Sequence, residues 1–292
     1  MHRLDVPTAL GPERSPVLAV AASAFLVVLK TVGALATNSL ALGAAALDSL
    51  IDCFVYSTSF LLRRRSAAPP DSDHAFGHGK FENLAMLGQG LFLIVAAGGL
   101  VVAGVGRLRS GEVPRETTLG VTLLSASLLV NLFVIPRLQR AAERSGSPSL
   151  KADSLHFRTD LWVNGSALAA LLVVALTGWA PADPLVALAV ASLVFRSASV
   201  LVLEALGDLS DRGLPPPLLR RIEVVVASFA PEVVGMHDLQ TRKSGSENFI
   251  SLHLEIPRDT SFVAAHEITV RVLHAVEEAV PRSKVFVHGD PV

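Results

Sequence analysis

The stretch LDSLIDC, Leu47–Cys53, places two aspartates four residues apart in an otherwise apolar run. This spacing puts both carboxylates, Asp48 and Asp52, on one face of a helix. At the centre of a membrane-spanning helix each charged group costs at least about 2.5–3.5 kcal/mol. Two such anions repel each other unless a shared proton or a metal ion lies between them. The alternative is a pair of acids hydrogen-bonded to neighbouring helices, with one of them protonated.

The composition around this stretch is that of an integral membrane protein. Of the 292 residues 51% are hydrophobic and 17% charged, and the mean hydropathy is +0.50. A soluble domain carries about 25% charged residues. The net charge of −1 and the lack of a basic stripe argue against a nucleic-acid partner. The single cysteine, Cys53, excludes an intrachain disulfide and a cysteine zinc cluster. We therefore expect a lipid bilayer around much of the chain.

Long apolar blocks alternate with short polar segments over the first two thirds of the chain. A spanning helix needs about 20 mostly apolar residues. Six blocks meet this length, at 16–36, 39–62, 82–106, 117–136, 153–179 and 183–206. After Gly207 helix-like and strand-like segments follow in the order αββαβ, which indicates a small α+β domain with its helices on one face of a sheet. The predicted fold is a membrane all-α domain of six transmembrane helices over 1–208, followed by an α+β domain over 209–292.

The distribution of basic residues predicts how the helices are oriented in the membrane. The segments after the second and fourth blocks carry most of them: Arg63, Arg64, Arg65, Lys80, Arg137, Arg140, Arg144 and Lys151. The segment after the third block holds three arginines, whereas those after the first and fifth hold none. Because lysine and arginine remain on the cytoplasmic side, both termini of this multi-pass chain are expected in the cytoplasm.

A second pair of polar residues lies in the fifth block, within DSLHFRTDLWVNG. His156 and Asp160 are again four residues apart. Together with Asp48 and Asp52 they supply three carboxylates and one imidazole, a set suited to tetrahedral Zn²⁺. The same set accepts Cd²⁺, Mn²⁺ or Fe²⁺. A lone intramembrane histidine is more often a packing or hydrogen-bonding residue, but one that completes a second pair with an acid is better explained as a ligand.

The loop after the second block, PPDSDHAFGHGKFE, contains a further group of possible ligands. Asp71, His74 and His78 place one carboxylate and two imidazoles within eight residues. Gly77 and Gly79 allow a tight backbone there. A solvated loop without a ligand is the alternative interpretation.

The α+β tail contains most of the remaining histidines. His237 and His253 lie on the two candidate strands, His266 on the candidate helix, and His288 with Asp290 on the last strand. Alternation along a strand puts His288 and Asp290 on the same sheet face. Scattered histidines are usually surface or core residues, so spacing alone makes a metal site plausible here without establishing it.

Several of these segments together resemble one family. NSLALGAAALDSLID, HAFGHGKFE, ADSLHFRTDLWVNG, HDLQTRKSG, LHLE and VHGD follow in the order seen in the cation diffusion facilitators, and are most similar to bacterial zinc and cadmium exporters of the ferrous-iron efflux type. The resemblance implies a homodimer in the inner membrane, in which each six-helix domain carries a cytoplasmic, metal-binding ferredoxin-like domain. It also implies exchange of a divalent metal ion for protons by alternating access.

The resemblance assigns roles to individual positions. It places the intramembrane transport site at Asp48, Asp52, His156 and Asp160. It places a loop site at Asp71, His74 and His78. It places a dimer-interface site for two metal ions at His237, His253, His266, His288 and Asp290. It pairs Lys80 with Asp211 to hold the dimer near the membrane surface. A quartet of three aspartates and a histidine is the pattern that the family associates with zinc and cadmium.

One departure and two rival functions remain. Arg196 lies about 20 Å into the sixth predicted helix, where we expect an uncharged residue, so it either snorkels or reaches a water-filled cavity. One rival is an intramembrane metalloenzyme, which needs a base and an open metal position, whereas four ligands already fill a tetrahedron. The other is a membrane-bound metal sensor, which has no need of the quartet. We therefore expect a transporter and not an enzyme.

Overall fold

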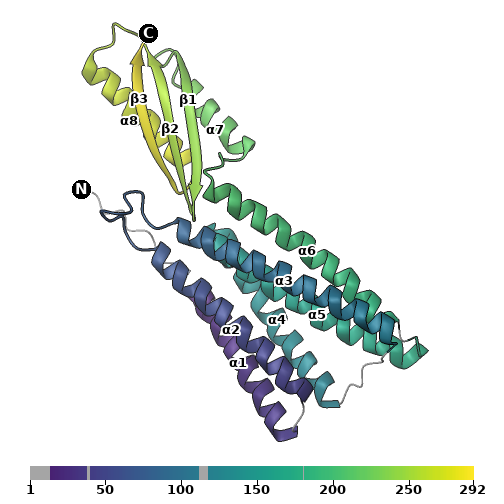
Figure 1. Ribbon diagram of the computed structural model, residues 1–292. Helices are drawn as coiled ribbons and strands as arrows, with labels where there is room; N and C mark the ends of the chain where they lie inside the picture. The colour runs from purple at the N-terminus through teal and green to yellow at the C-terminus, as the bar shows by residue number, and fades with distance from the viewer. Residues whose placement is uncertain (1–13, 38–39, 112–117, 180) are drawn as a thin grey trace. The chain divides into compact units, whose positions relative to one another are not determined.

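The computed structural model describes residues 14–37, 40–111, 118–179 and 181–292 (Figure 1). The chain divides into two compact units, Met1–Ala205 and Leu206–Val292, which we call the helical unit and the mixed unit. The long helices are α1 Arg14–Thr37, α2 Leu40–Ser66, α3 Lys80–Ser110, α4 Thr118–Ser145, α5 Pro148–Thr177 and α6 Ala182–Leu209. The mixed unit continues with α7 Pro216–Ala227, β1 Gly235–Ser244, β2 Glu247–Ile256, α8 Phe262–Ala279 and β3 Ser283–Pro291. The predicted order of six helices followed by αββαβ is confirmed.

Several helices extend beyond the apolar blocks that predict them. α4 continues through Pro136 to Ser145, and α5 begins at Pro148 instead of residue 153. The segment after Pro136 is polar but rich in residues with high helix propensity. A proline in the first turn of α5 is also favourable, because its missing N–H has no partner in a helix at that position. Hydropathy therefore locates the membrane-facing part of each helix and misses its polar ends.

Small residues let α3 approach α6 within the helical unit. A Cβ atom added at Gly90 would lie 2.7 Å from the Cγ2 atom of Val202. One added at Gly104 would lie 3.1 Å from the Cγ atom of Leu188. Close backbone approach at small residues is typical of helix pairs in membranes, where packing and not water exclusion holds helices together.

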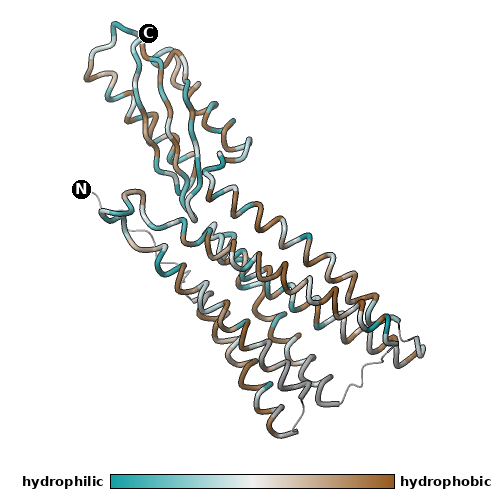
Figure 2. Tube along the Cα trace, in the orientation of Figure 1, coloured by the Kyte–Doolittle hydropathy of each residue, from teal (hydrophilic) through white to brown (hydrophobic). Residues whose placement is uncertain are grey.

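The outer surface of the helical unit is apolar. Large side chains such as Phe54, Val95 and Leu176 are exposed on it. Figure 2 shows long hydrophobic stretches along α3 and α6, whereas residues of both kinds alternate in the mixed unit. α3 and residues Pro184–Leu209 are long and apolar enough to cross a membrane. A surface of this kind is stable against lipid and unfavourable against water.

The mixed unit contains a three-stranded sheet in the order β1-β2-β3. β1 and β2 are antiparallel and joined by a short turn at Gly245, whose φ of +60° suits glycine. β2 and β3 are parallel, and α8 provides the crossover between them. Ile250, Leu252 and Leu254 on one face of β2 are buried in a core with residues of α7 and α8. The intervening side chains of β2, including His253, therefore point to the other face.

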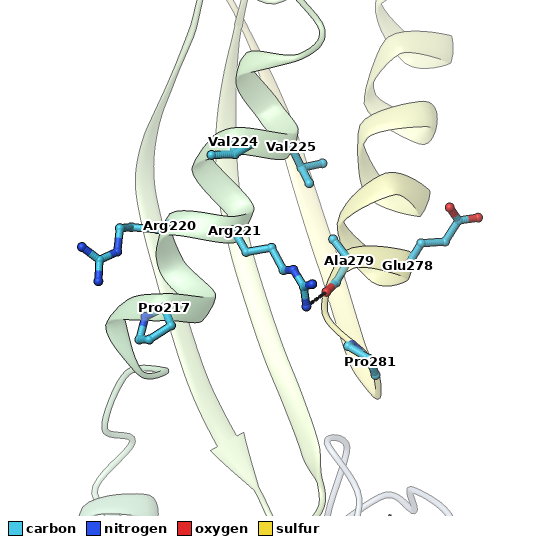
Figure 3. Close-up of a pocket in the computed structure, with 8 residues that line it drawn as sticks. All are labelled: Pro217, Arg220, Arg221, Val224, Val225, Glu278, Ala279 and Pro281. Carbon is cyan, nitrogen blue, oxygen red and sulfur yellow. Dashed lines mark hydrogen bonds between the residues drawn. The ribbon is translucent and has the colours of Figure 1, made fainter.

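A groove runs between α7 and the C-terminal end of α8 in the layer of helices (Figure 3). Its volume is about 780 Å³, and it is lined by Pro217, Arg220, Arg221, Val224, Val225, Glu278, Ala279 and Pro281. The Nη1 group of Arg221 donates a hydrogen bond of 3.1 Å to the carbonyl oxygen of Ala279. This contact joins the two helices that cover the sheet.

Candidate metal sites

α2 and α5 bring three of the four predicted intramembrane residues together. The Nε2 atom of His156 lies 3.1 Å from Oδ1 of Asp52 and 3.8 Å from Oδ1 of Asp160. All three residues offer a ligand atom within 4.8 Å of the others. The fourth predicted residue, Asp48, belongs to α2, but its side chain lies outside the described residues. Asp52 of α2 thus meets the pair of His156 and Asp160 on α5, as a shared ion site requires.

Aromatic side chains surround the imidazole of His156. The ring of Tyr56, one turn after Asp52 on α2, lies 5.0 Å from it, and the ring of Phe92 on α3 lies 5.5 Å away. Tyr56 also stacks on Phe157 at 4.7 Å. Contacts from two further helices fix the plane of the imidazole, so that its Nε2 atom faces the two aspartates.

Sequence reasoning missed two polar residues beside this histidine. Gln89 on α3 donates a hydrogen bond of 3.0 Å from Nε2 to Oδ1 of Asp153, and the same Nε2 atom lies 3.5 Å from Nδ1 of His156. Both side chains are buried. Asp153 precedes His156 by three residues, so it lies on the same face of α5. That spacing, and the cost of a buried amide in an apolar helix, were the available signals.

The three predicted loop residues also lie together. Oδ1 of Asp71 is 3.1 Å from Nδ1 of His74, and Oδ2 is 3.2 Å from Nε2 of His78. The two imidazole rings are 4.4 Å apart. His78 is buried and stacks on Phe81, while the other two residues are exposed. The loop therefore has one fixed imidazole and two ligands that reach water.

The backbone of this loop holds the Asp71 carboxylate in place. Its Oδ1 atom accepts hydrogen bonds from the N–H groups of His74, at 2.7 Å, and Asp73, at 3.1 Å. The bond from the backbone of His74 is the main cause that lowers the pKa of Asp71 below its ordinary value. Gly77, with φ +83°, closes the turn by donating to the carbonyl oxygen of His74. The carboxylate is thereby kept ionised, the form that binds a cation.

Strand register aligns three histidines across the sheet of the mixed unit. His237 of β1 pairs with His253 of β2, and His253 pairs with His288 of β3. Directly paired residues share a face, here the face opposite α7 and α8. Oδ2 of Asp290 lies 2.8 Å from Nδ1 of His253 and 3.3 Å from Nε2 of His237, and its Oδ1 lies 3.2 Å from Nε2 of His288. One carboxylate thus contacts three imidazoles.

The electrostatics of this cluster favour the ionised carboxylate. A hydrogen bond from His253 is the main cause that lowers the pKa of Asp290, and the charges of His288, His253 and His237 act in the same direction. A site that keeps its carboxylate charged and its imidazoles adjacent is suited to metal binding.

The structure does not bring His266 into this group. It is exposed on α8. Among the described residues, no group of side chains that could hold a metal ion includes it. It lies one turn before Thr269, whose methyl group would be 3.4 Å from a Cβ atom at Gly289. α8 therefore packs on β3 next to His266, but the His266 side chain itself stays outside the row.

Two acids that sequence reasoning missed adjoin the histidine row. Oε1 of Glu255 lies 3.3 Å from Nδ1 of His237. Glu255 follows His253 by two residues, and this period-two spacing could have identified it. Asp238 groups with His237 and His253, at a position where φ is +49° and the pairing of β1 with β2 shifts. This irregularity of β1 has no clear sequence signal.

The predicted pair of Lys80 and Asp211 involves both units. Lys80 begins α3 in the helical unit, whereas Asp211 belongs to the mixed unit. Oδ1 of Asp211 lies 3.3 Å from Nη1 of Arg242 within its own unit. The pair of Lys80 with Asp211 stays a prediction.

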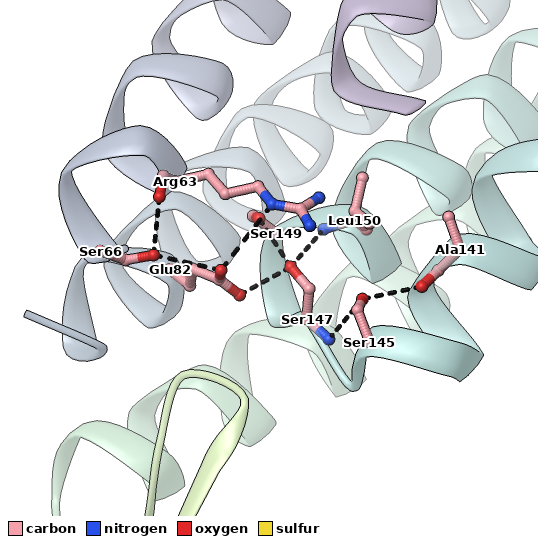
Figure 4. A network of polar contacts seen from close by, with 8 residues as sticks. All are labelled: Arg63, Ser66, Glu82, Ala141, Ser145, Ser147, Ser149 and Leu150. Carbon is pink, nitrogen blue, oxygen red and sulfur yellow. Dashed lines mark hydrogen bonds and ion pairs between the residues drawn. The ribbon is translucent and has the colours of Figure 1, made fainter. Parts of the chain in front are cut away.

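A buried network joins α2, α3 and the start of α5 (Figure 4). Glu82 accepts hydrogen bonds from the hydroxyl groups of Ser147, at 2.6 Å, and Ser66, at 3.1 Å. The Nε atom of Arg63 lies 3.9 Å from the same carboxylate. Because Glu82 lies in the first turn of α3, four residues after His78, the network anchors the end of the loop site to the helix that carries His156.

Arg196 lies on the outer side of α6. It is exposed, as are the neighbouring apolar residues Leu193, Phe195 and Val200. No contact between Arg196 and the transport residues occurs in the part of the chain that the structure describes. It is therefore not part of the intramembrane cluster.

Comparisons with known proteins identify the family of the chain. Residues 17–210 match the family model of the cation efflux transmembrane domain, and residues 214–292 match that of the cation efflux protein cytoplasmic domain. The chain is 35% identical over 278 residues to the cation-efflux pump FieF of Escherichia coli, which covers 95% of this chain and 92% of that protein. FieF of Cronobacter sakazakii is also 35% identical, with the same coverage.

One solved structure matches about a quarter of this chain. The metal-bound C-terminal domain of the CzcD transporter from Thermotoga maritima is 26% identical, and the match covers 26% of this chain and 87% of that chain with a TM-score of 0.25.

The two family models match consecutive parts of the chain, and the FieF relatives cover nearly all of it. The chain belongs to the cation efflux family, the cation diffusion facilitators. It is therefore a membrane protein and a transporter, not an enzyme. The alternative of an intramembrane metalloenzyme is wrong.

Proposed function

We propose that the protein exports divalent metal cations from the cytoplasm across the bacterial inner membrane in exchange for protons. The convergence of Asp52, His156 and Asp160 from two helices carries this proposal. A set of carboxylates and one imidazole suits Zn²⁺ at tetrahedral geometry, so Zn²⁺ is the expected cargo and Cd²⁺, Fe²⁺ and Mn²⁺ are the alternatives. FieF relatives, named as cation-efflux pumps, support the direction of transport.

The transport site consists of Asp48, Asp52, His156 and Asp160. Each ligand must lose its proton before it binds a metal ion, so metal affinity falls as the pH drops. When the site faces the cytoplasm it binds the metal; when the helices rock and open it outward, protons replace the metal. An inward proton gradient therefore drives metal out. The lipid-facing exterior and the basic cytoplasmic segments support six spanning helices with both termini inside.

The other two clusters act on the cytoplasmic side. Asp71, His74 and His78 form a loop site. The cytoplasmic site holds two ions, with the ligands His237, His253, His266, His288 and Asp290. Two groups of possible ligands that share His253 support this number. His266, exposed on α8, is the one proposed ligand that the structure does not place in these groups. The transport domain ends at residue 208, near the end of α6, and the domain over 209–292 carries the cytoplasmic site.

Filling the cytoplasmic site draws two protomers of a homodimer together. The pair of Lys80 and Asp211 holds the dimer near the membrane surface. Reversing the charge of each residue singly should weaken dimer formation or transport, and reversing both together should restore it. A double reversal that restores nothing removes this pair from the proposal.

The rival interpretation as a membrane-bound metal sensor is not supported by the family assignment. A sensor would use the cytoplasmic histidines but has no need of a buried intramembrane cluster. The cost of placing those acids within the membrane therefore favours a transporter.

Flux measurements on the full chain in liposomes that enclose a zinc dye distinguish these functions. A transporter of the proposed kind moves Zn²⁺, moves it faster with an opposed pH gradient, and loses this flux with Asp52→Ala. A sensor binds Zn²⁺ and moves none. Asp52→Ala protein that transports Zn²⁺ at the normal rate would falsify the quartet. The same liposomes loaded with Cd²⁺, Fe²⁺ or Mn²⁺ rank the cargo.

A further inference from the structure

Gln89 is a buried amide whose side chain crosses from α3 to the back of the transport-site histidine. It is 2% exposed and lies on the same face of α3 as the buried residues Met86 and Leu93. A buried amide in an apolar helix interface is unfavourable unless it is hydrogen-bonded. A role in helix packing alone would leave it bonded at both ends. Within the described part of the chain, however, its Oε1 atom has no hydrogen-bond partner.

The two ring nitrogens of His156 have different neighbours. Nε2 faces Oδ1 of Asp52 at 3.1 Å, so it is the nitrogen that would bind the metal ion. Nδ1 lies on the other side of the ring, 3.5 Å from Nε2 of Gln89. In a neutral imidazole one nitrogen carries the proton and the other accepts a hydrogen bond. The group that faces Nδ1 therefore influences which tautomer is present.

Asp153 determines which end of the Gln89 amide faces the histidine. The NH₂ group of Gln89 donates a hydrogen bond of 3.0 Å to Oδ1 of Asp153, and a carboxylate oxygen without a proton only accepts. The amide must therefore present its NH₂ group to Asp153. The same NH₂ group then faces Nδ1 of His156, while the amide oxygen points away without a partner.

This orientation favours the tautomer that cannot bind metal. A donor opposite Nδ1 requires a lone pair there, so the ring proton lies on Nε2 and is donated to Asp52. Metal binding at Nε2 needs the opposite tautomer, in which the proton has moved to Nδ1. That N–H group would then meet the N–H of Gln89, and its hydrogen bond would be lost. The number of protons on the ring stays the same in this exchange.

We propose that Gln89, oriented by Asp153, is a positioning residue that weakens metal binding at His156 and so speeds release of the ion. The inference rests on the proposed transport function and adds a residue that regulates the metal affinity of the same site. A transporter must release its cargo as well as bind it. Most residues behind a metal-binding histidine strengthen binding by accepting its other N–H, whereas Gln89 presents a donor.

The test uses the full chain in liposomes with Zn²⁺ as the only metal. Gln89→Met removes the donor at similar volume, and Asp153→Asn frees the amide to turn its oxygen toward Nδ1. For both variants we expect the KM for Zn²⁺ to fall by roughly threefold to tenfold, as for the loss of one opposing hydrogen bond. The maximal rate should fall as well, because release is slower. Met86→Leu, a volume-conserving change in the same interface, should leave both values unchanged.

Equilibrium binding separates this role from a structural one. Zn²⁺ affinity is measured in detergent by competition with a zinc dye, for each variant with and without Asp52→Ala, so that the difference reports the intramembrane site. Tighter binding in both variants supports the inference. Unchanged or weaker binding together with a lower rate overturns it, because a packing defect lowers both.

The test also covers a variant that does not fold and a protein that does not transport. Asp153→Asn changes no side-chain volume and decides the question if Gln89→Met does not fold. Failure of the transport function itself would be seen separately, as a wild-type flux that Asp52→Ala does not reduce.

Discussion

The intramembrane and cytoplasmic sites use the same two ligand types but differ in how far water reaches them. The side chain of His156 is 2% exposed, whereas those of His237 and His288 are 42% and 66% exposed. Acids inside a membrane that hold no ion must hold a proton or a hydrogen bond, so the helical site is expected to exchange one occupant for another. Exposed ligands are solvated when empty, so the sheet site can fill and empty with the metal concentration. This difference in burial is what we expect if the helical site exchanges metal for protons and the sheet site senses metal.

Removal of the buried imidazole should give the largest effect. His156→Ala removes the only nitrogen ligand of the predicted quartet, and we expect Zn²⁺ flux to fall by about 100-fold or more, since metal affinity depends on every ligand. Flux into liposomes with an enclosed zinc dye measures this. His274→Ala, an exposed histidine on α8 that pairs with Glu277, is the matched control and should transport normally. Equal flux in both variants would show that burial does not mark the exchange site.

Removal of an exposed imidazole should impair sensing and spare transport. With His288→Ala we expect Zn²⁺ affinity of the cytoplasmic site to fall by about tenfold, because Asp290 and His253 remain. Maximal flux at saturating Zn²⁺ should change less than twofold, roughly, if the site acts through affinity alone. Calorimetry on Asp52→Ala protein isolates this binding from that of the quartet. Unchanged calorimetric stoichiometry and affinity would rule His288 out as a ligand.

The Glu82 network should matter for stability and not for metal affinity. Glu82→Ala leaves the hydroxyl groups of Ser66 and Ser147 and the side chain of Arg63 without their acceptor. We expect a loss of about 1–3 kcal/mol in the free energy of unfolding, typical of a buried charged acceptor. Thermal unfolding in detergent reports it. Glu143→Ala, which removes an exposed carboxylate on α4 that contacts Gln139, should change the unfolding temperature little. A similar loss in both variants would remove the distinction between buried and exposed acids.

The smallest effect concerns the pH dependence of the mixed unit. The pKa of Asp290 is lower in the folded protein than in the unfolded chain, mainly through its hydrogen bond from His253. The unfolded state therefore binds more protons in acid, and the contribution of Asp290 is present above the ordinary carboxyl pKa of about 3.9 and lost as the pH falls through its lowered value. Unfolding temperatures of metal-free wild-type and Asp290→Asn protein should differ above this range and converge below it. A difference that persists at the acid end would contradict the pairing.

The sequence predicts the site residues best where one helix or strand supplies a whole pattern. Asp52, His156 and Asp160 were found from four-residue spacings, because such spacing fixes a shared face before any packing is known. His288 and Asp290 were found from strand alternation for the same reason. The helix ends were missed because hydropathy reports the lipid-facing part of α4 and α5 and not their polar turns.

Contacts across elements were beyond sequence reasoning. Gln89 meets Asp153 and His156 only because α3 packs on α5, and nothing within α3 encodes that register. The row of His237, His253 and His288 depends on how three strands align, including the irregular pairing after His237. Which face of α8 carries His266 relative to the sheet depends likewise on how the helix packs.

The aligned histidines have a consequence for the geometry of any bound ions. The ring centres of His237 and His253 are 5.3 Å apart, and those of His253 and His288 are 4.9 Å apart. These values are close to the separation of about 4.8 Å between neighbouring strands. Two ions held along this row would inherit their spacing from the backbone hydrogen bonds of the sheet, so the distance between metals is set by main-chain geometry that side-chain substitutions leave in place.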